Sequence, residues 1–206
     1  MKSIQEYIKI YKESDRRKSR RRLPFRLVSE EDTRCRLEAL YILEVERRGK
    51  HIILDDNTRD KIARVARWLC KSTKQGLILM GTPGNGKSTM LHCLFRLLAP
   101  YAVFGDTYEV VEWMKRQPQE FMKNLNEDVL LLDDLGEDAA RVMNYGEETF
   151  PMTKLFSYRY HQMLTTIIAT NLDANDIKDR YGDRVHDRLK ETYEVIFYDA
   201  PSYRGK

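Results

Sequence analysis

A glycine-rich run that ends in a lysine and a hydroxyl carries the clearest chemical signal in the sequence. The run Gly81-Thr82-Pro83-Gly84-Asn85-Gly86-Lys87-Ser88-Thr89 satisfies the pattern G-x-x-x-x-G-K-[ST]. Its glycines let successive backbone N–H groups converge on phosphate oxygens, its lysine supplies a cation for the β- and γ-phosphates, and its hydroxyl is a ligand for Mg²⁺. We therefore predict that residues 81–89 bind the phosphates of ATP and that Ser88 ligates Mg²⁺.

Two carboxylates follow an apolar segment that has the length of a buried strand. The segment is Val129–Leu132, and Asp133 and Asp134 come directly after it. Acids commonly end strands, so this pattern is weak alone, but beside the glycine-rich motif it indicates a Walker B segment. Asp133 would hold Mg²⁺ through water, and Asp134 would orient or deprotonate the attacking water. The separation between the two motifs would let their strands lie side by side.

The elements that must position these residues follow an α/β pattern. From residue 76 onward, short apolar runs alternate with helical periods, as in a parallel sheet covered by helices on both faces. A helix over 87–98 would point its positive end at the bound anion. Upstream, the pattern predicts a helix from Asp32-Thr33 to Gly49, a strand-like segment at 51–54, and a helix capped by Asn57 or Thr58. The five predicted strands are 77–80, 101–104, 129–132, 166–170 and 195–198.

Length and charge suggest one ATPase domain with a basic extension. The sequence has 206 residues, of which 42% are hydrophobic, which allows one core and a short accessory segment. We expect a helical extension at 1–50 that binds a partner or nucleic acid, and the ATPase domain at 51–206. Residues 1–50 hold 15 Lys and Arg against 9 Asp and Glu, whereas the remainder holds 21 against 23.

The sequence favours a soluble protein of the cytoplasm. Its N-terminus is charged throughout, and no apolar run approaches the roughly 20 residues that span a bilayer. The three cysteines, Cys35, Cys70 and Cys93, are far apart and lack C-x-x-C spacing. They therefore predict neither a disulfide framework nor a zinc site.

A basic run near the N-terminus has two readings. It contains Arg16, Arg17, Lys18, Arg20, Arg21 and Arg22 within seven positions. Such a run either binds nucleic-acid phosphates through counterion release or serves as a solvated tether. Ile4, Ile8 and Tyr11, at helical spacing just before it, are candidates for a docking face toward a partner protein.

Taken in order, the motifs resemble the DnaC-like ATPases, an AAA+ group that includes bacterial helicase loaders and IstB-like transposition helpers. The resemblance rests on the two motifs above and on Ser-Tyr-Arg-Tyr, Ile-Ile-Ala-Thr-Asn-Leu, Tyr-Gly-Asp-Arg-Val-His-Asp-Arg-Leu and the final Ser-Tyr-Arg. It covers about residues 76–204 and implies an AAA+ P-loop fold with little or no lid domain. It also implies assembly into homo-oligomers on single-stranded DNA, with ATP and Mg²⁺ at each subunit junction.

Further site residues follow from this resemblance. Asn171 would be the sensor that contacts the γ-phosphate and the attacking water, although an ordinary turn former is the alternative. Arg188 is the first choice, and Arg184 the second, for an arginine that reaches a neighbouring subunit's γ-phosphate; pairing with acids of their own helix is the alternative. Arg204 would contact nucleotide within its own subunit. The resemblance also places Arg141 and Tyr145 where these loaders insert a helix that contacts single-stranded DNA.

The leading functional hypothesis is an ATPase that binds single-stranded DNA and loads a replicative helicase. Three alternatives stay open: an IstB-like transposase helper, a small P-loop kinase, and an ATP-gated DNA-binding adaptor with little turnover. The adaptor is considered because the acid pair is Asp-Asp, whereas many AAA+ proteins have Asp-Glu. The partner, the oligomer size and any DNA sequence preference do not follow from the sequence.

Overall fold

The computed structural model describes residues 29–52, 54–99, 101–117, 129–138, 142–144, 147–199 and 202–203, with the backbone alone at 142–144 and 147–149. Its strands are β1 (Gly76–Gly81), β2 (Ala102–Asp106), β3 (Val129–Leu135), β4 (Val142–Asn144), β5 (Glu147–Thr149), β6 (Thr165–Thr170) and β7 (Tyr193–Tyr198). Its helices are α2 (Glu30–Arg47), α3 (Asp56–Lys71), α4 (Lys87–Leu98), α5 (Thr107–Arg116), α7 (Pro151–Gln162), α8 (Ala174–Tyr181) and α9 (Asp183–Thr192).

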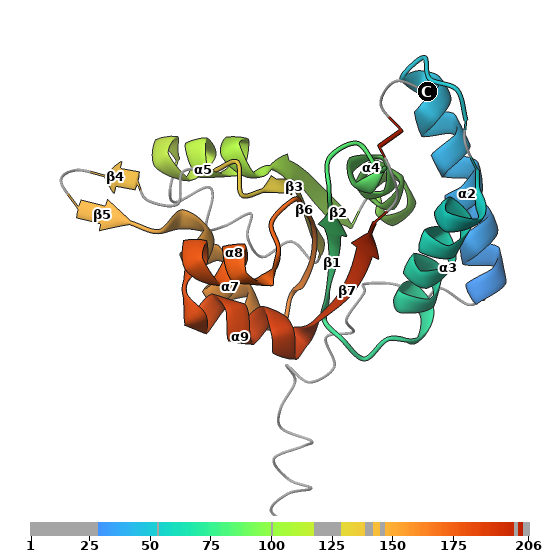
Figure 1. Ribbon diagram of the computed structural model, residues 1–206. Coiled ribbons are helices and arrows are strands. Elements are labelled where there is room, and N and C mark those ends of the chain that lie inside the picture. Colours follow the sequence, from blue (N-terminus) through green and yellow to red (C-terminus); the bar gives the residue numbers. More distant parts are fainter. Residues whose placement is uncertain are drawn as a thin grey trace, which may run out of the picture.

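The centre of the molecule is a parallel sheet with the strand order β2-β3-β6-β1-β7 (Figure 1). This confirms the predicted five-stranded α/β architecture. The expectation that the strand of the glycine-rich motif lies beside the strand of Asp133 was wrong, because β6 lies between β1 and β3. Every residue of β6 is buried, which suits a strand at the middle of a sheet that is covered on both faces. The three chemical motifs consequently end at the same edge of the sheet.

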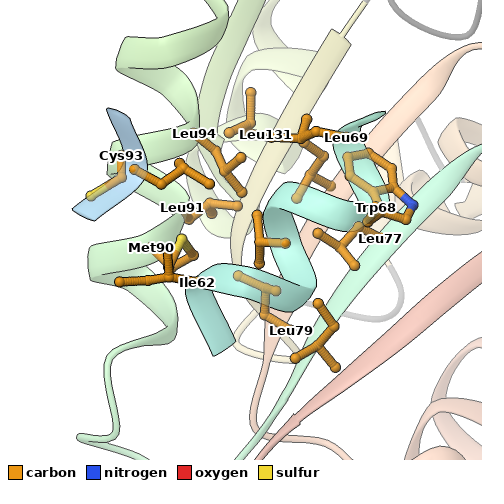
Figure 2. Close-up of a cluster of buried hydrophobic side chains, with 14 of the residues drawn as sticks. Ile62, Trp68, Leu69, Leu77, Leu79, Met90, Leu91, Cys93, Leu94 and Leu131 are labelled. Atoms are coloured by element: carbon orange, nitrogen blue, oxygen red, sulfur yellow. The ribbon is translucent and has the colours of Figure 1, made fainter. Parts of the chain in front are cut away.

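Helices cover both faces of this sheet, as predicted. On one face α2, α3 and α4 pack over the sheet, and the side chains labelled in Figure 2 form the centre of that core. On the other face α5, α7, α8 and α9 enclose a second cluster that includes Leu132, Phe156 and Ile168. Burial of these apolar surfaces is the main source of the free energy that holds the layers together.

The helix α2 belongs to this core although it lies within the predicted extension. Leu37 and Tyr41 are buried in the same cluster as Met90 and Leu94 of α4. The helix begins at Glu30, where Ser29 accepts a hydrogen bond from the Asp32 backbone N–H at 3.3 Å, slightly earlier than its pattern predicts. The described part of residues 1–50 therefore packs on the ATPase core, and the proposed division at residue 50 stays a prediction.

Two local predictions differ from the structure near the start of α3. Asp55 caps the helix by accepting a hydrogen bond from the Thr58 backbone N–H at 2.8 Å, so the predicted caps, Asn57 and Thr58, lie two and three residues too late. A carboxylate one residue before the helix competes well for this position. We expected a strand at 51–54, but residues 51, 52 and 54 do not belong to a strand.

The segment after Asp138 also departs from expectation. Residues 142–144 pair with 147–149 as an antiparallel hairpin, whereas the resemblance implied an inserted helix there. Figure 1 shows β4 and β5 projecting away from the main sheet. No described helix combines the length and the apolar character that crossing a bilayer requires.

Candidate nucleotide-binding site

The loop between β1 and α4 has a backbone that only glycine adopts without strain. Gly81 has φ of 152°, and a Cβ there would lie 2.0 Å from the carbonyl oxygen of Tyr198. Gly86 has φ of 96° and precedes α4, whose first turn has no side-chain cap. The first N–H groups of α4 are therefore left for a ligand, as expected of a phosphate-binding loop.

Lys87 is held over this loop by oxygen atoms. Its side chain is buried, and its Nζ donates to the carbonyl oxygens of Gly81 and Thr82, both at 2.7 Å, and to Asn85 Oδ1 at 3.3 Å. Asn85 is itself buried and donates to the carbonyl of Tyr198. A buried ammonium needs such acceptors. Phosphate oxygens bound in the loop would replace some of them, and because these oxygens are negatively charged, their hydrogen bonds with Lys87 would be stronger.

Ser88 and Asp133, the two predicted metal ligands, are in contact at the end of the sheet. The Ser88 hydroxyl donates to Asp133 Oδ1 at 3.0 Å. Burial raises the pKa of Asp133, the neighbouring Asp134 raises it further, and the hydrogen bond from Ser88 opposes both. A desolvated carboxylate beside a hydroxyl is a fitting pair of ligands for a hard cation such as Mg²⁺.

These two oxygens cannot form a complete metal site. Among the described residues, no group of three or more His, Cys, Asp and Glu side chains could hold a metal ion. Mg²⁺ usually keeps several waters and combines one or two protein ligands with substrate phosphates. The pair Ser88 and Asp133 fits that mode of binding.

Asp134 and Asn171 face the same space from adjacent strands. Asp134 has a left-handed backbone conformation, with φ of 51°. Its carbonyl oxygen accepts hydrogen bonds from the Thr107 hydroxyl at 2.8 Å and from the Glu137 backbone N–H at 3.0 Å. Such a backbone is uncommon for aspartate and costs free energy. Asn171 follows β6 and is exposed. Because β6 lies beside β3, the two side chains can act on one substrate.

A single pocket of about 250 Å³ joins these groups. Part of its lining is the glycine-rich loop together with Asp134 and Asn171. The rest of the lining consists of residues from α2, from the segment after it and from the C-terminal segment, to which the sequence analysis gave no role. They are Tyr41, Val45, Arg48, Lys50, His51 and Tyr203. No spacing in the sequence signals them, because α2 and the C-terminal segment reach the loop only through the tertiary fold.

Tyr203 ties the C-terminal segment to the pocket. Its backbone N–H donates to the carbonyl of Gly84 at 2.8 Å, and its hydroxyl donates to Asp55 Oδ2 at 2.9 Å. Asp55 also caps α3. The segment that contains Tyr203 is therefore anchored at two points, on the phosphate loop and on the start of α3.

The two candidate arginines of α9 lie in different environments. Arg188 donates to Ser157 Oγ at 2.7 Å and to His161 Nε2 at 3.2 Å, and its guanidinium lies 4.8 Å from the centre of the Tyr160 ring. Arg184 is exposed and, in the portion of the chain that the structure covers, makes no hydrogen bond or ion pair. Neither arginine pairs with acids of α9 in that portion.

Arg159, the arginine of the Ser-Tyr-Arg-Tyr motif, has a structural role. It is fully buried, and it donates to Thr166 Oγ1 at 2.7 Å and to the Thr165 carbonyl at 2.6 Å. It thereby fixes the start of β6, far from the phosphate loop at the other end of the sheet. Several predicted contacts lie outside the described residues and stay predictions. They are Arg16, Arg17, Arg20, Arg21, Arg22, Arg141, Tyr145 and Arg204.

Comparison with known proteins gives structural likeness without close sequence relatives. No protein-family model matches the chain, and no curated protein matches it. A crystal structure of DnaI shares 22% identity at a TM-score of 0.56, covering 73% of this chain and 87% of that one. AMPPCP-bound DnaA from Aquifex aeolicus shares 18% sequence identity at a TM-score of 0.53, and the match covers 71% of this chain and 48% of that one. Domain III of Thermotoga maritima DnaA shares 15% sequence identity at a TM-score of 0.53, and the match covers 74% of this chain and 66% of that one.

These likenesses show the fold. The chain has the α/β P-loop fold of the DnaI and DnaA structures. It spans about half the length of the Aquifex aeolicus DnaA structure that it matches.

Proposed function

We propose that the protein is an ATP-hydrolysing AAA+ switch of DNA replication that binds single-stranded DNA and loads a replicative helicase. The observation that carries the proposal is the convergence of four groups on one pocket. These groups are Lys87, Ser88, Asp134 and Asn171, and Asp133 accepts a hydrogen bond from Ser88. Each has the chemistry that its position requires in phosphoryl transfer to water.

The roles of these residues follow from their atoms. The backbone N–H groups at the start of α4 and the ammonium of Lys87 bind the β- and γ-phosphates. Ser88 and Asp133 would hold Mg²⁺, which neutralises charge on the same phosphate oxygens. Asp134 accepts a proton from the attacking water, and the Asn171 amide orients that water against the γ-phosphate.

Two observations support the role in replication: the proteins that share this fold, and the order of the sequence motifs. DnaI and the replication initiation protein DnaA share this fold, and the motif order resembles helicase loaders. We extend this to ATP-dependent assembly of several copies on single-stranded DNA. A transposase in place of the helicase is the competing partner, since the same ATPase and DNA-binding surface would serve both.

An arginine from a neighbouring subunit would complete the site. The contacts of Arg188 with Ser157, His161 and Tyr160 hold it against its own chain, whereas Arg184 is exposed. This environment favours Arg184 as the arginine that reaches across, and it reverses the order of preference that the sequence gave. Such arginines stabilise transition-state charge and contribute about 10³ to 10⁵ to the rate.

Mixing two inactive variants tests the assembled site. Arg184→Ala should bind ATP normally and hydrolyse it at least about a hundredfold more slowly on single-stranded DNA. Adding Lys87→Ala subunits should recover part of the activity, because a junction can again combine an intact phosphate loop with an intact arginine. Arg188→Ala serves as the matched comparison and should mainly lower stability. Absence of rescue at every mixing ratio would refute a shared site.

A second arm of the experiment addresses the partner. The wild-type protein should transfer a hexameric replicative helicase onto single-stranded DNA only when ATP is present. Recovery of a transposase complex together with failure to bind any replicative helicase would overturn the loader assignment and leave the ATPase site intact.

A further inference from the structure

The part of the pocket lining that lies outside the phosphate loop includes an arginine whose orientation is fixed. Arg48 lines the pocket just after α2. Its Nε donates to Glu44 Oε1 at 2.8 Å, and Glu44 is buried, with 2% of its side chain exposed. Among the described residues, the two Nη groups of Arg48 make no hydrogen bond. The guanidinium is therefore anchored through one edge and presents its remaining N–H donors on the other.

The charge around Arg48 makes it an oriented donor more than a phosphate-attracting cation. Glu44 also pairs with Arg47, at 2.9 Å to Nε and 2.8 Å to Nη2, and it remains ionised because the hydrogen bond from Arg47, assisted by that from Arg48, lowers the pKa of Glu44 to about 2. The negative end of α2 lies at the same place. Both neutralise part of the positive charge of Arg48.

The lining outside the phosphate loop suits a base and a ribose. Tyr41, His51 and Tyr203 contribute aromatic rings and Val45 an apolar side chain. Among the described residues that line the pocket, Asp134 is the only carboxylate. A nucleotide whose phosphates lie on the glycine-rich loop places its remaining half here, and its ring nitrogens and ribose oxygens are acceptors that guanidinium N–H groups recognise.

We propose that Arg48 is a specificity residue that hydrogen-bonds the base and ribose half of the bound nucleotide, and that buried Glu44 is the residue that positions it. This inference rests on the proposed nucleotide site. It also gives α2, which lies in the predicted extension and carries Glu44, a part in nucleotide binding.

Arg47 provides a matched control for this proposal. It pairs with the same carboxylate as Arg48, yet it does not line the pocket, and 63% of its side chain is exposed. Removing Arg47 takes two hydrogen bonds from Glu44, whereas removing Arg48 takes one, so the control disturbs Glu44 at least as much as the test variant does. Only the removal of Arg48 takes a donor away from the nucleotide.

The test measures binding of Mg²⁺-ATP and of Mg²⁺-tripolyphosphate, which has no base or ribose, by equilibrium titration. Arg48→Ala should weaken ATP about tenfold to a hundredfold, as expected for loss of hydrogen bonds from a charged donor. It should leave tripolyphosphate within about twofold, and Arg47→Ala should leave both within about twofold. Thermal melting of each variant without nucleotide checks that the fold is retained.

Glu44→Gln tests the positioning role separately. It should weaken ATP and not tripolyphosphate, and it should add little further loss in the Arg48→Ala background, because both changes remove one oriented contact. Full additivity would show that Glu44 acts through general stability and would overturn its positioning role.

Three results would overturn the inference, each for a different reason. Equal loss of ATP and tripolyphosphate in Arg48→Ala would make Arg48 a phosphate ligand. Unchanged ATP binding in that variant would remove Arg48 from the site. Wild-type protein that binds neither ligand would refute the nucleotide site itself, and with it the proposed function.

Discussion

Replacing Gly81 with alanine tests the geometry of the phosphate loop most sharply. The new Cβ would lie 2.0 Å from the carbonyl oxygen of Tyr198 and 2.8 Å from its carbonyl carbon. These are backbone atoms of β7, which pairs with β1 at this position, so they cannot move away as a flexible side chain would. The backbone at Gly81, with φ of 152°, is also strained for any residue with a Cβ.

The magnitude follows from two separate costs. Backbone strain at such a position costs about 1–3 kcal/mol, and overpacking against atoms that cannot yield costs about 1–3 kcal/mol more. We therefore expect Gly81→Ala to lose about 2–6 kcal/mol of unfolding free energy. ATP binding should weaken as well, because the carbonyl of Gly81 accepts a hydrogen bond from Lys87.

Gly49 supplies the control for this experiment. It has φ of 64°, yet an added Cβ would meet nothing within 4 Å, so Gly49→Ala should cost only about 1 kcal/mol. Urea unfolding followed by circular dichroism measures both losses. If the two variants lost the same free energy, the close approach of β1 to β7 in this account would be wrong.

Three further predictions concern named side chains. Asp134→Asn should still bind ATP but hydrolyse it about 10² to 10⁴ times more slowly, and undiminished phosphate release would move the catalytic base elsewhere. Tyr203→Phe removes the hydrogen bond to Asp55 and should cost about 1 kcal/mol in urea unfolding; no loss would show that the hydroxyl does not anchor the C-terminal segment. The pKa of Glu44 is lowered, chiefly by Arg47, so ionised Glu44 stabilises the fold above its unfolded pKa, and this stabilisation is lost as pH falls from about 4.5 toward 2. Glu44→Gln should therefore remove about 2 kcal/mol of the acid dependence of the unfolding free energy. An unchanged dependence of unfolding free energy on pH would contradict the ion pair.

The sequence predicted the parts of the site that are encoded locally. The glycine-rich loop, the helix from Lys87 and the carboxylates after Val129 are short segments in which residue type and spacing fix the structure. The alternation of apolar strands and helical periods likewise predicted the parallel sheet and its two helical layers. The strand of Asp133 nevertheless continues to Leu135, because Asp133 pairs with Asp106 of β2 and Leu135 pairs with Thr170 of β6.

Features that depend on contacts between distant segments could not be predicted in this way. Nothing in the sequence shows that β6 separates β1 from β3, since strand order is set by packing of the whole sheet. Tyr41 and Arg48 precede the glycine-rich loop by about forty residues, and they line the pocket only because α2 packs on α4. The environment of Arg188 was likewise hidden, because Ser157 and His161 approach it from a different helix.

The central claim, that this pocket binds ATP through the glycine-rich loop, is tested most directly by the affinity of Lys87→Ala for Mg²⁺-ATP. Lys154→Ala, which removes an exposed lysine of α7, is the control. We predict that Lys87→Ala weakens binding at least about a hundredfold, because a desolvated charge-assisted contact is lost, while Lys154→Ala binds within about twofold of wild type. Wild-type affinity in Lys87→Ala, in a protein that melts as a folded chain, would contradict the account.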